Sequence, residues 1–499
     1  MHMTENLKKA INYEWEQMNK TEVKASKPGF HACPPIGWIN DPNGLSFYKG
    51  ECHLFYQYYP YDTQWGPMHW GHCKSKDMVK WEYIPCALAP DMEYDGQGCF
   101  SGTAIQDGEE HILMYTSVLD QTKEDGTRLV RQTQSIAIGD GHVYNKIEQN
   151  PVIKADILPE GSSKEDFRDP KIWKDGDTYF AVVGSKDASG EGQLALFSAK
   201  ELTDWKFEKI LDSGKGRYGT MWECPDFFSL EDRQILIVSP MEMKKEGLEF
   251  QEGSNSIYFI GDYDKEKKEF IRDRAYQIDY GPDFYAPETV ETTDGRRVLV
   301  GWMQNWTNYL TPADFQWSGM MTVPRELHIE NGRLIQEPVR ELENYRVDPI
   351  TYEAVEVSAN TCETLDGISG RCLDMNVKAT GEWDKFVIRL AADREHETLL
   401  IYDKKEGILT LDRSKAGMEK DSIPVRSMYV PAFENGLQLR ILLDKYSVEI
   451  FANEGRQVMT ALLYTPQEAD KICFQTDGNA LLWVEKYSID VGCDFVENR

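Results

Sequence analysis

The 499-residue sequence is short of positive charge and contains no long apolar run. Its 55 Lys and Arg residues stand against 84 Asp and Glu residues, which gives a formal net charge of −29. A field of this sign repels phosphate backbones and anionic lipid, so we expect neither nucleic acid nor a membrane surface as a partner. No stretch approaches the roughly 18 consecutive apolar residues of a membrane-spanning helix. The composition therefore indicates a globular chain.

Two further absences concern the compartment in which the protein works. Residues 1–20 are polar and charged, without the apolar core of a secretion signal, so we expect a cytoplasmic protein. The ten cysteines are scattered and include no CxxC pair. In the cytoplasm they are most simply reduced thiols that pack as small hydrophobic side chains, so no disulfide framework is expected.

The sequence also lacks the motifs of most cofactor and metal chemistry. It contains no P-loop and no GxSxG elbow. Gly214–Gly219 matches the pattern GxGxxG, but an extended run follows it where a dinucleotide site needs a helix, so we expect a loop. His69 and His72 lie three residues apart in a strand or loop, which places them on opposite faces, and no third ligand accompanies them. We therefore expect no cofactor and no bound metal.

One segment near the N-terminus has helical periodicity. Leu7, Ile11 and Trp15 lie at helical spacing behind Thr4 as the N-cap, which predicts an amphipathic helix in an N-terminal extension of residues 1–27. Beyond this extension, short runs of β-branched and aromatic residues alternate with Gly, Asp, Asn and Pro turns. This pattern predicts an all-β chain.

Five segments share one plan: a strand, a charged or Gly-containing turn, and a second hydrophobic strand. They recur every 55 to 68 residues when they are aligned on Pro42, Gly102, Pro170, Pro225 and Pro287. Units of this size are too small to bury a face alone, so the repetition predicts stacking around an axis. About 60 residues suit a four-stranded propeller blade with long loops. We therefore predict a five-bladed β-propeller over residues 28–340; five unrelated hairpins in a sandwich explain the shared plan less well.

The repeat ends near residue 340. Residues 341–355 are rich in proline and charge and are predicted to be a linker. Residues 356–499 contain short strands between turns, among them DKFVIRL, TLLIYD, GLQLRILLD and SVEIFANEG. This pattern predicts a C-terminal antiparallel β-sandwich. It has no concentration of Asp, Glu and His comparable with that of the first domain, so we expect a structural role.

Three of the five repeats place a carboxylate beside the aligned proline. Asp41 and Asp169 precede it directly, and Glu223 lies two residues before it. A proline marks where a strand begins, and it holds the preceding residue in an extended conformation. Because the first strand of each blade lines the central channel of a propeller, the three acids should converge on the axis. Converging carboxylates repel one another, which raises at least one pKa and gives the protonated and ionised pair that glycosidic bond cleavage needs. Any one of these acids alone is better explained as a turn residue, but three in register favour a catalytic site.

Distinctive motifs surround these acids and continue along the chain: GWINDPNG (37–44), FSGTA (100–104), FRDP (167–170), ECPDFF (223–228), DYGPDFYAPE (279–288), GWMQNW (301–306), MTVPREL (321–327) and VEIFANEG (448–455). They resemble the motifs of glycoside hydrolase family 32, which contains invertases, sucrose-6-phosphate hydrolases, levanases and inulinases. The resemblance runs from about Pro28 to the C-terminus and implies a five-bladed propeller joined to a β-sandwich. Ile39 stands where the family usually has Met and keeps the position apolar.

The resemblance implies a role for each acid. Asp41 corresponds to the nucleophile, Glu223 to the general acid/base and Asp169 to the stabiliser of the transition state. Asp41 would attack the anomeric C2 of a fructosyl unit while Glu223 protonates the departing oxygen, and water activated by Glu223 would release fructose from the covalent intermediate. Asp169 would bind fructose hydroxyls and oppose the oxocarbenium charge. We predict retention of configuration, with the carboxyls of Asp41 and Glu223 roughly 5–5.5 Å apart.

Other positions of the family pattern imply the substrate contacts. Polar contacts to fructose hydroxyls are expected from Asn40, Gln57, Ser101 and Arg168. An aromatic wall is expected from Trp38, Trp65, Phe100 and Trp302. Of these, Trp65 and Trp302 could equally be packing residues between blades.

The leading hypothesis is a cytoplasmic β-fructofuranosidase that releases terminal β-D-fructosyl units from sucrose, sucrose 6-phosphate or short fructo-oligosaccharides. A fructosyltransferase shares the covalent intermediate and differs in acceptor-side loops that a sequence does not display. The NDPNG, RDP and ECP motifs speak against a related glycosidase of arabinose polymers, and the three intact acids speak against an inactive sugar-binding propeller. The sequence leaves open the choice between free and phosphorylated sucrose, the substrate length, and whether the protein forms a homo-oligomer.

Overall fold

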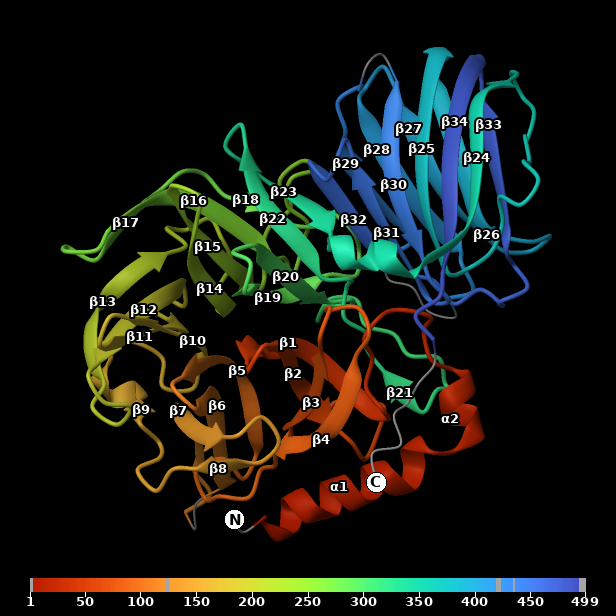
Figure 1. Ribbon diagram of the computed structural model, residues 1–499. Helices are drawn as coiled ribbons and strands as arrows, with labels where there is room; N and C mark the ends of the chain where they lie inside the picture. Colours follow the sequence, from red (N-terminus) through yellow and green to blue (C-terminus); the bar gives the residue numbers. More distant parts are fainter. Residues whose placement is uncertain (1–2, 123–124, 419–422, 434–435, 493–499) are drawn as a thin grey trace.

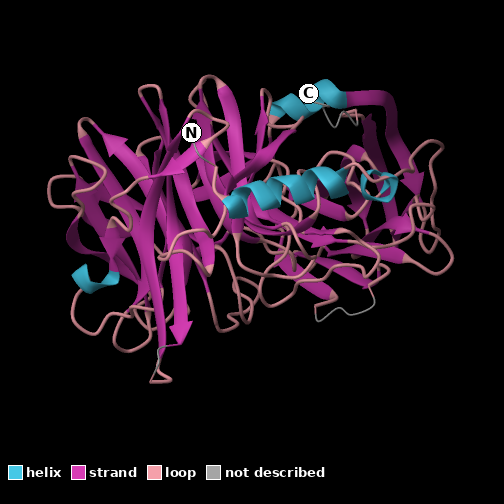
Figure 2. Cartoon of the chain, turned by 90° about the horizontal axis from the view of Figure 1, so that it is seen from below, coloured by secondary structure: helices cyan, strands magenta, loops and turns pink. Residues whose placement is uncertain are grey.

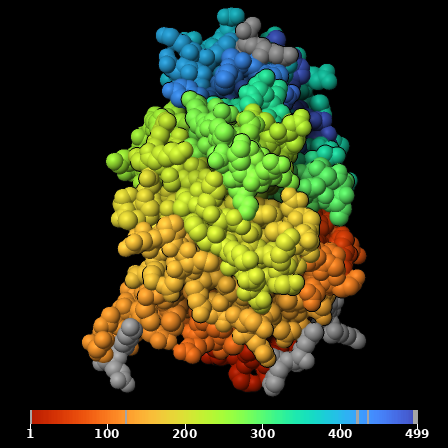
Figure 3. All heavy atoms as spheres, turned by 90° about the vertical axis from the view of Figure 1, so that its left-hand side faces the viewer, coloured from red at the N-terminus to blue at the C-terminus, as the bar shows by residue number. Residues whose placement is uncertain are grey.

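The computed structural model describes residues 3–122, 125–418, 423–433 and 436–492. Figure 1 shows two β-rich parts, a ring of sheets that runs from red to green and a stack of blue strands beside it. Seen from the side, blue residues of the stack lie against green residues that end the ring (Figure 3). The predicted fold class, a β-propeller followed by a β-sandwich, is confirmed.

Five sheets lie in the described residues between Gly37 and Pro338. The first contains β1 (Gly37–Tyr48), β2 (Glu51–Tyr59), β3 (His69–Ser75), β4 (Glu82–Leu88) and β21 (Trp317–Ser318). The second contains β5 (Gly98–Asp107), β6 (Glu110–Thr122), β7 (Arg128–Gly139), β8 (Tyr144–Lys146) and β9 (Ile153–Lys154), followed by a short 3-10 helix, η1 (Ala155–Ile157). The third contains β10 (Phe167–Asp175), β11 (Thr178–Lys186), β12 (Gly192–Ala199) and β13 (Lys206–Ser213). The fourth contains β14 (Trp222–Leu230), β15 (Arg233–Pro240), β16 (Ile257–Asp264), β17 (Glu269–Arg272) and β18 (Tyr276–Gln277). The fifth contains β19 (Tyr285–Glu291), β20 (Arg297–Trp302), β22 (Arg325–Glu330) and β23 (Arg333–Pro338).

The first strand of each sheet lies at the axis of the ring. Strand β1 contacts β5, β5 contacts β10, β10 contacts β14, β14 contacts β19, and β19 contacts β1 again. This circle of contacts closes the sheets into a propeller, because each blade packs on the next. All five aligned positions of the sequence repeat fall within these inner strands.

Each inner strand contains a β-bulge at its repeated position. Its pairing with the next strand shifts register at residues 39–42, 100–102, 168–171, 223–226 and 285–288. In three strands the residue before the aligned proline has a positive φ, +65° at Asp169, +46° at Cys224 and +51° at Ala286. The expectation that each proline begins the strand and holds its neighbour extended is therefore wrong. Pairing starts before the proline, and the extra residue of the bulge orients the acid toward the axis.

The N-terminal helix forms as predicted, but it buries a different face. Helix α1 (Glu5–Met18) is capped by Thr4, whose hydroxyl accepts a hydrogen bond from the backbone N–H of Leu7. A short helix, α2 (Thr21–Ala25), follows it. Figure 2 shows α1 lying across the underside of the strands. Leu7 and Glu14 are buried, whereas Trp15 is 44% exposed, so the predicted apolar face is wrong at Trp15. The Glu14 carboxylate accepts a hydrogen bond from the backbone N–H of Cys86 in β4, and burial raises the pKa of Glu14 to about 7.

The second part is a two-sheet β-sandwich. One sheet has the order β24 (Arg346–Val357), β34 (Asn479–Ile489), β25 (Leu373–Glu382), β30 (Leu437–Leu443), β31 (Ser447–Ala452), β32 (Gln457–Leu462). The other has the order β29 (Val425–Tyr429), β28 (Ile408–Lys415), β27 (Glu397–Asp403), β26 (Lys385–Ala392), β33 (Lys471–Thr476). Their facing side chains form one hydrophobic core.

The predicted linker, residues 341–355, contains regular structure. A 3-10 helix, η2 (Arg340–Tyr345), leads directly into β24, which pairs with β34. The prediction that the sandwich starts only at residue 356 is therefore wrong. The proline and charges that suggested a linker are tolerated because β24 is an edge strand with mostly exposed side chains.

The cysteines depart from expectation at one pair. Cys362 and Cys473 form a disulfide within the sandwich, so the prediction of reduced thiols throughout is wrong for these two. They lie 111 residues apart, and no local spacing in the sequence marks them as partners. Cys493 lies outside the described residues, and the others that the structure describes are free.

Propeller and sandwich meet at a buried cluster of charges. His31 Nδ1 lies 2.7 Å from Asp444 Oδ2, and His31 Nε2 lies 2.9 Å from Glu449 Oε1. Arg325 pairs with Glu449 from one side and with Asp279 at 3.0 Å from the other. Although burial alone lowers the pKa of His31, the hydrogen bonds to Asp444 and Glu449 raise it to about 9. The imidazolium and the guanidinium therefore neutralise acids that come from both domains.

The GxGxxG match and the pair His69 and His72 lie in a turn and in a strand of the propeller. Residues 214–219 form a turn between β13 and β14, as predicted. His69 and His72 lie on β3; His72 Nε2 is 2.9 Å from His53 Nδ1, and His69 Nδ1 is 2.9 Å from the Pro67 carbonyl. Within the described ranges no three or more His, Cys, Asp or Glu side chains gather as metal ligands. No helix in the part of the chain that the structure describes is long and apolar enough to cross a membrane.

Candidate active site

The three predicted acids come from three inner strands and lie around shared contacts. Asp41 is on β1, Asp169 on β10 and Glu223 on β14. Cys224, next to Glu223, connects them: its backbone N–H donates to Asp169 Oδ2 at 3.0 Å, and its Sγ lies 3.4 Å from Asp41 Oδ2 and 3.6 Å from Asp169 Oδ2. The structure therefore brings the acids together at the propeller axis, although Asp41 and Glu223 are 182 residues apart in sequence.

Asp41 is buried and keeps one oxygen unoccupied. Its Oδ2 accepts a hydrogen bond of 2.6 Å from the Ser101 hydroxyl, whereas its Oδ1 has no hydrogen-bond partner among the described residues. Burial and the nearby charge of Glu223 raise the pKa of Asp41 to about 6. At neutral pH the carboxylate is thus mostly ionised, and one of its oxygens is free to act as a nucleophile.

Glu223 is held at both carboxylate oxygens. Arg168 donates to Oε1 from Nε at 3.0 Å and from Nη2 at 2.9 Å. The Tyr285 hydroxyl donates to Oε2 at 2.6 Å. Arg168 is itself fixed by hydrogen bonds from Nη1 to Gln132 at 3.2 Å and to Asp166 at 3.1 Å. This clamp fixes the orientation of Glu223, as a proton donor requires.

Asp169 combines backbone strain with burial. Its backbone N–H donates to the Thr116 hydroxyl at 2.8 Å, which stabilises the left-handed conformation at the bulge. Burial raises the pKa of Asp169 to about 7; Arg168 opposes this shift, and the charges of Glu223 and Asp41 add to it. Asp41, Asp169 and Glu223 therefore place three carboxyl groups beside one guanidinium, that of Arg168, which does not offset the rise in the pKa of Asp169.

The predicted polar contacts already use some of their hydrogen-bonding capacity within the protein. Asn40 Oδ1 accepts from the Trp38 indole N–H at 2.9 Å, and Gln57 Nε2 donates to the Cys99 carbonyl at 3.0 Å. Ser101 and Arg168 bind Asp41 and Glu223 as described. Asn40, Gln57 and Ser101 are buried, so their side chains hold defined positions. We call the region around Asp41, Asp169 and Glu223 at the propeller axis the mouth.

The predicted aromatic wall divides into a core and a rim. Trp38 and Trp302 are both buried and meet edge to face with ring centroids 5.9 Å apart. Phe100 meets Trp65 edge to face at 6.0 Å, and Trp65 is 48% exposed. Trp302 therefore packs under the mouth, while Trp65 is placed to contact a ligand.

The sequence reasoning missed four residues around the mouth. Trp306 stacks on Trp38 at 6.3 Å, and the half-exposed Tyr309 meets Trp38 edge to face at 5.6 Å. The other two, Tyr285 and Cys224, contact the acids directly. The repeat itself contained the signal for them: Tyr285 lies two residues before its aligned proline, as Glu223 does, and Cys224 occupies the place of Asp169.

The arrangement suits cleavage of a glycosidic bond by two carboxyl groups. It offers a buried carboxylate with a free oxygen, a second carboxyl group in a fixed orientation, and a third acid that can oppose positive charge.

Comparisons with known proteins cover both parts of the chain. Residues 31–338 match the Glycosyl hydrolases family 32 N-terminal domain, and residues 341–490 match the Glycosyl hydrolases family 32 C terminal. The sucrose-6-phosphate hydrolase of Zymomonas mobilis subsp. mobilis is 37% identical over 442 residues, which cover 86% of this chain and 84% of that protein. The raffinose invertase of Escherichia coli is 34% identical over 464 residues, which cover 91% of this chain and 93% of that protein.

Solved structures show the same similarity in three dimensions. The Bombyx mori GH32 beta-fructofuranosidase is 32% identical with a TM-score of 0.82, and the match covers 97% of this chain and 98% of the Bombyx mori chain. The sucrose-6-phosphate hydrolase from Lactobacillus gasseri has a TM-score of 0.84 at 26% identity, with 96% of both chains covered. Both family domains, in order and over nearly the full length, match this sequence. The chain therefore belongs to glycosyl hydrolases family 32.

Proposed function

We propose that this protein is a retaining β-fructofuranosidase that releases terminal β-D-fructosyl units from sucrose, sucrose 6-phosphate or short fructo-oligosaccharides. The observation that carries the proposal is the unoccupied Oδ1 of Asp41 in a buried site shared with Glu223. The names of the similar proteins, sucrose-6-phosphate hydrolase, raffinose invertase and beta-fructofuranosidase, support the choice of a fructoside substrate.

In the first step, Asp41 Oδ1 attacks the anomeric C2 of the fructosyl unit. The C2–Oδ1 bond forms while the glycosidic bond from C2 to the leaving oxygen breaks, and protonated Glu223 gives its proton to that oxygen. Asp169 accepts hydrogen bonds from fructose hydroxyls, and its negative charge stabilises the oxocarbenium-like transition state. The product of this step is a covalent fructosyl-enzyme and a free aglycone.

In the second step, water replaces the aglycone. Glu223, now a carboxylate, takes a proton from the water as its oxygen attacks C2, and the bond to Asp41 breaks. Arg168 and Tyr285 hold the two Glu223 oxygens in one orientation, so the same group serves both steps. Two displacements at C2 return the original configuration.

The decisive assay measures fructose and glucose released from sucrose, sucrose 6-phosphate, kestose and inulin. Asp41→Asn should lower kcat/KM on the order of 10⁴-fold, because the amide is a poor nucleophile. The matched control is Asp348→Asn, since Asp348 also precedes a proline at a positive φ of +51° but is exposed on the sandwich. Absence of fructose release from all four substrates would overturn the proposal, and full activity of Asp41→Asn would overturn the assignment of the nucleophile.

A fructosyltransferase remains the second candidate because it uses the same intermediate. Equal release of glucose and fructose from sucrose indicates hydrolysis, whereas glucose in clear excess indicates transfer to a sugar acceptor. Retention is checked in the same reaction with methanol added: NMR should show methyl β-fructoside. Formation of the α-anomer would contradict a covalent intermediate on Asp41.

A further inference from the structure

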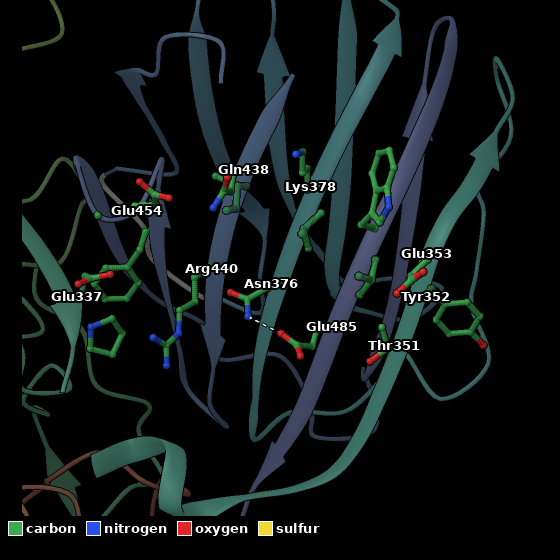
Figure 4. A pocket seen from close by; sticks show the side chains of 17 residues that line it. Glu337, Thr351, Tyr352, Glu353, Asn376, Lys378, Gln438, Arg440, Glu454 and Glu485 are labelled. Carbon is green, nitrogen blue, oxygen red and sulfur yellow. Dashed lines mark hydrogen bonds between the residues drawn. The ribbon is translucent and has the colours of Figure 1, made fainter. Parts of the chain in front are cut away.

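A groove of about 410 Å³ lies on the outer face of the six-stranded sheet of the sandwich. Strands β24, β34, β25 and β30 form its floor, and the end of β23 and the turn between β31 and β32 form its wall. Figure 4 shows Asn376, Lys378, Gln438 and Arg440 on neighbouring strands of this floor. The catalytic acids lie on the inner strands of the propeller, and none of them lines this groove.

Strand register places the groove residues in two rows across the sheet. Lys378 is paired with Gln438 on one side and with Trp483 on the other. In the next row, Asn376 is paired with Arg440 on one side and with Glu485 on the other. Side chains alternate along each strand, so the residues between these rows face the hydrophobic core. Neighbouring strands are about 4.8 Å apart, so each row offers a ladder of polar groups at roughly the width of a sugar ring.

The chemistry of the rows fits a polyhydroxylated ligand. Trp483 is half-buried, with Lys378 Nζ 6.0 Å from its ring centroid, and gives the outer face of the sheet a flat apolar surface. Beside it, Gln438 adds an amide to the lining of the groove. Asn376 Nδ2 donates to Glu485 Oε2 at 3.2 Å, which presents an amide and a carboxylate side by side. An aromatic surface flanked by amide and carboxylate groups can stack on the C–H face of a sugar and pair with its hydroxyls.

Charge restricts the ligand to a neutral one. Four carboxylates and two cations line the groove: Glu337, Glu353, Glu454, Glu485, Lys378 and Arg440. Arg440 is already engaged, since its Nε and Nη2 donate to Asp374 at 3.0 Å and 2.8 Å. Glu454 is likewise engaged, by Arg456 at 3.1 Å. Glu337, Glu353 and Glu485 still outnumber Lys378, so the field in the groove is negative and repels phosphorylated sugars and nucleotides.

We infer that this groove is a second carbohydrate site, which binds a neutral oligosaccharide with one ring stacked on Trp483. Binding there would hold a longer saccharide on the enzyme at a place remote from the catalytic acids. The inference stands on the groove residues alone and does not need the catalytic roles to be correct.

The test is titration calorimetry on Asp41→Asn, which keeps the substrate intact, with nystose, inulin, maltohexaose and cellohexaose as probes. At least one probe should occupy two classes of site. Adding Trp483→Ala should weaken one of them at least about tenfold and leave the other unchanged. The matched control is Leu481→Ala, because Leu481 lies on the same strand and is exposed but does not line the groove. If wild type hydrolyses no fructoside yet one site still disappears with Trp483→Ala, the groove stands and the catalytic proposal fails.

A second variant guards against misfolding. Gln438→Ala removes a surface amide without touching the core, so it should weaken the same site while the unfolding temperature stays within a few degrees of that of the parent. The inference is overturned if none of the four saccharides binds outside the catalytic mouth, or if both variants retain both sites. It is also overturned if Trp483→Ala instead changes a dimer into a monomer in sedimentation, since the groove would then be covered by a second copy of the chain.

Discussion

Two of the buried carboxylate clusters, one at the propeller mouth and one at the junction with the sandwich, differ in the charges that face them. At the propeller mouth, burial raises the pKa of Asp41 to about 6 and of Asp169 to about 7, with Arg168 as the adjacent guanidinium. At the junction with the sandwich, burial acts in the same direction, yet the pKa of Asp444 and that of Glu449 lie below their usual values.

Pairing explains the difference. His31 donates to Asp444 and Glu449, and Arg325 also binds Glu449, so each buried acid at the junction has a cation within hydrogen-bond distance. At the mouth, Asp41 and Asp169 have no cation within hydrogen-bond distance among the residues that the structure describes, and they repel each other and Glu223. Unpaired buried acids are costly for stability but available for chemistry, whereas paired ones join domains and are chemically inert.

After the proposed nucleophile Asp41, the largest effect is expected when Glu223, the proposed proton donor of the mouth, is replaced. Glu223→Gln keeps the shape and can still accept from Arg168, but it cannot give a proton, so kcat/KM on sucrose should fall roughly 10²- to 10⁴-fold. Asp166→Asn is the control, because Asp166 also binds Arg168, at 3.1 Å, without touching the other acids. An equal fall in both variants would mean that the charge balance of Arg168, and not proton transfer, limits the rate.

Breaking the junction should cost stability and leave catalysis intact. His31→Ala leaves Asp444 and Glu449 without the imidazolium between them, so the free energy of unfolding should fall by about 3–5 kcal/mol while kcat at 25 °C stays within twofold. Urea unfolding at pH 7 and a sucrose assay measure the two quantities. His396→Ala is the control: His396 lies 3.1 Å from Asp393 at the surface, and losing an exposed pair should cost less than about 1 kcal/mol. Equal losses in the two variants would refute the importance of burial.

The junction should also make stability depend on alkaline pH. A group whose pKa is higher in the folded state than in the unfolded state stabilises fully below the unfolded value and loses that contribution as pH rises to the folded value. For His31 these values are 6.5 and about 9, so the free energy of unfolding should decline across this window by roughly 3 kcal/mol. Unfolding measured at several pH values should show this decline in wild type and a flatter curve in His31→Gln. A parallel decline in both would assign it to other groups.

The sequence predicted the acids of the mouth because the repeat supplied their context. Asp169 and Asp348 both precede a proline, and both have a positive φ at a shift in strand register, +65° and +51°. Asp169 lies buried at the propeller axis and Asp348 lies exposed on an edge strand, so the Asp-Pro dipeptide alone does not distinguish them. Tyr285 was not predicted because it carries a phenol and not a carboxyl group, although it occupies the same position in its repeat as Glu223.

The junction could not be predicted in the same way. His31 and its carboxylate partners are more than 410 residues apart in the chain, and neither lies in a repeat that would align them. Arg325 and Glu449 lie in motifs that indicated the family, but a motif does not state which side chains meet across two domains. The disulfide between Cys362 and Cys473 escaped for the same reason.

The smallest effect concerns the hydrogen bond that keeps Asp41 ionised. Because the Ser101 hydroxyl lowers the pKa of Asp41, which burial and Glu223 together hold at about 6, activity should fall as pH decreases through about 6. Ser101→Ala should move this acid limb of kcat/KM upward by roughly half a unit to one unit. Ser101 is also a proposed substrate contact, so a change in KM alone would not be diagnostic, whereas the midpoint of the pH profile reports the ionisation of the free enzyme. Ser117→Ala is the control, since Ser117 is buried in the second blade and its hydroxyl bonds to Thr133 and Ser135 of the same blade. A midpoint that stays in place, or moves to lower pH, would mean that a group other than Asp41 controls the acid limb.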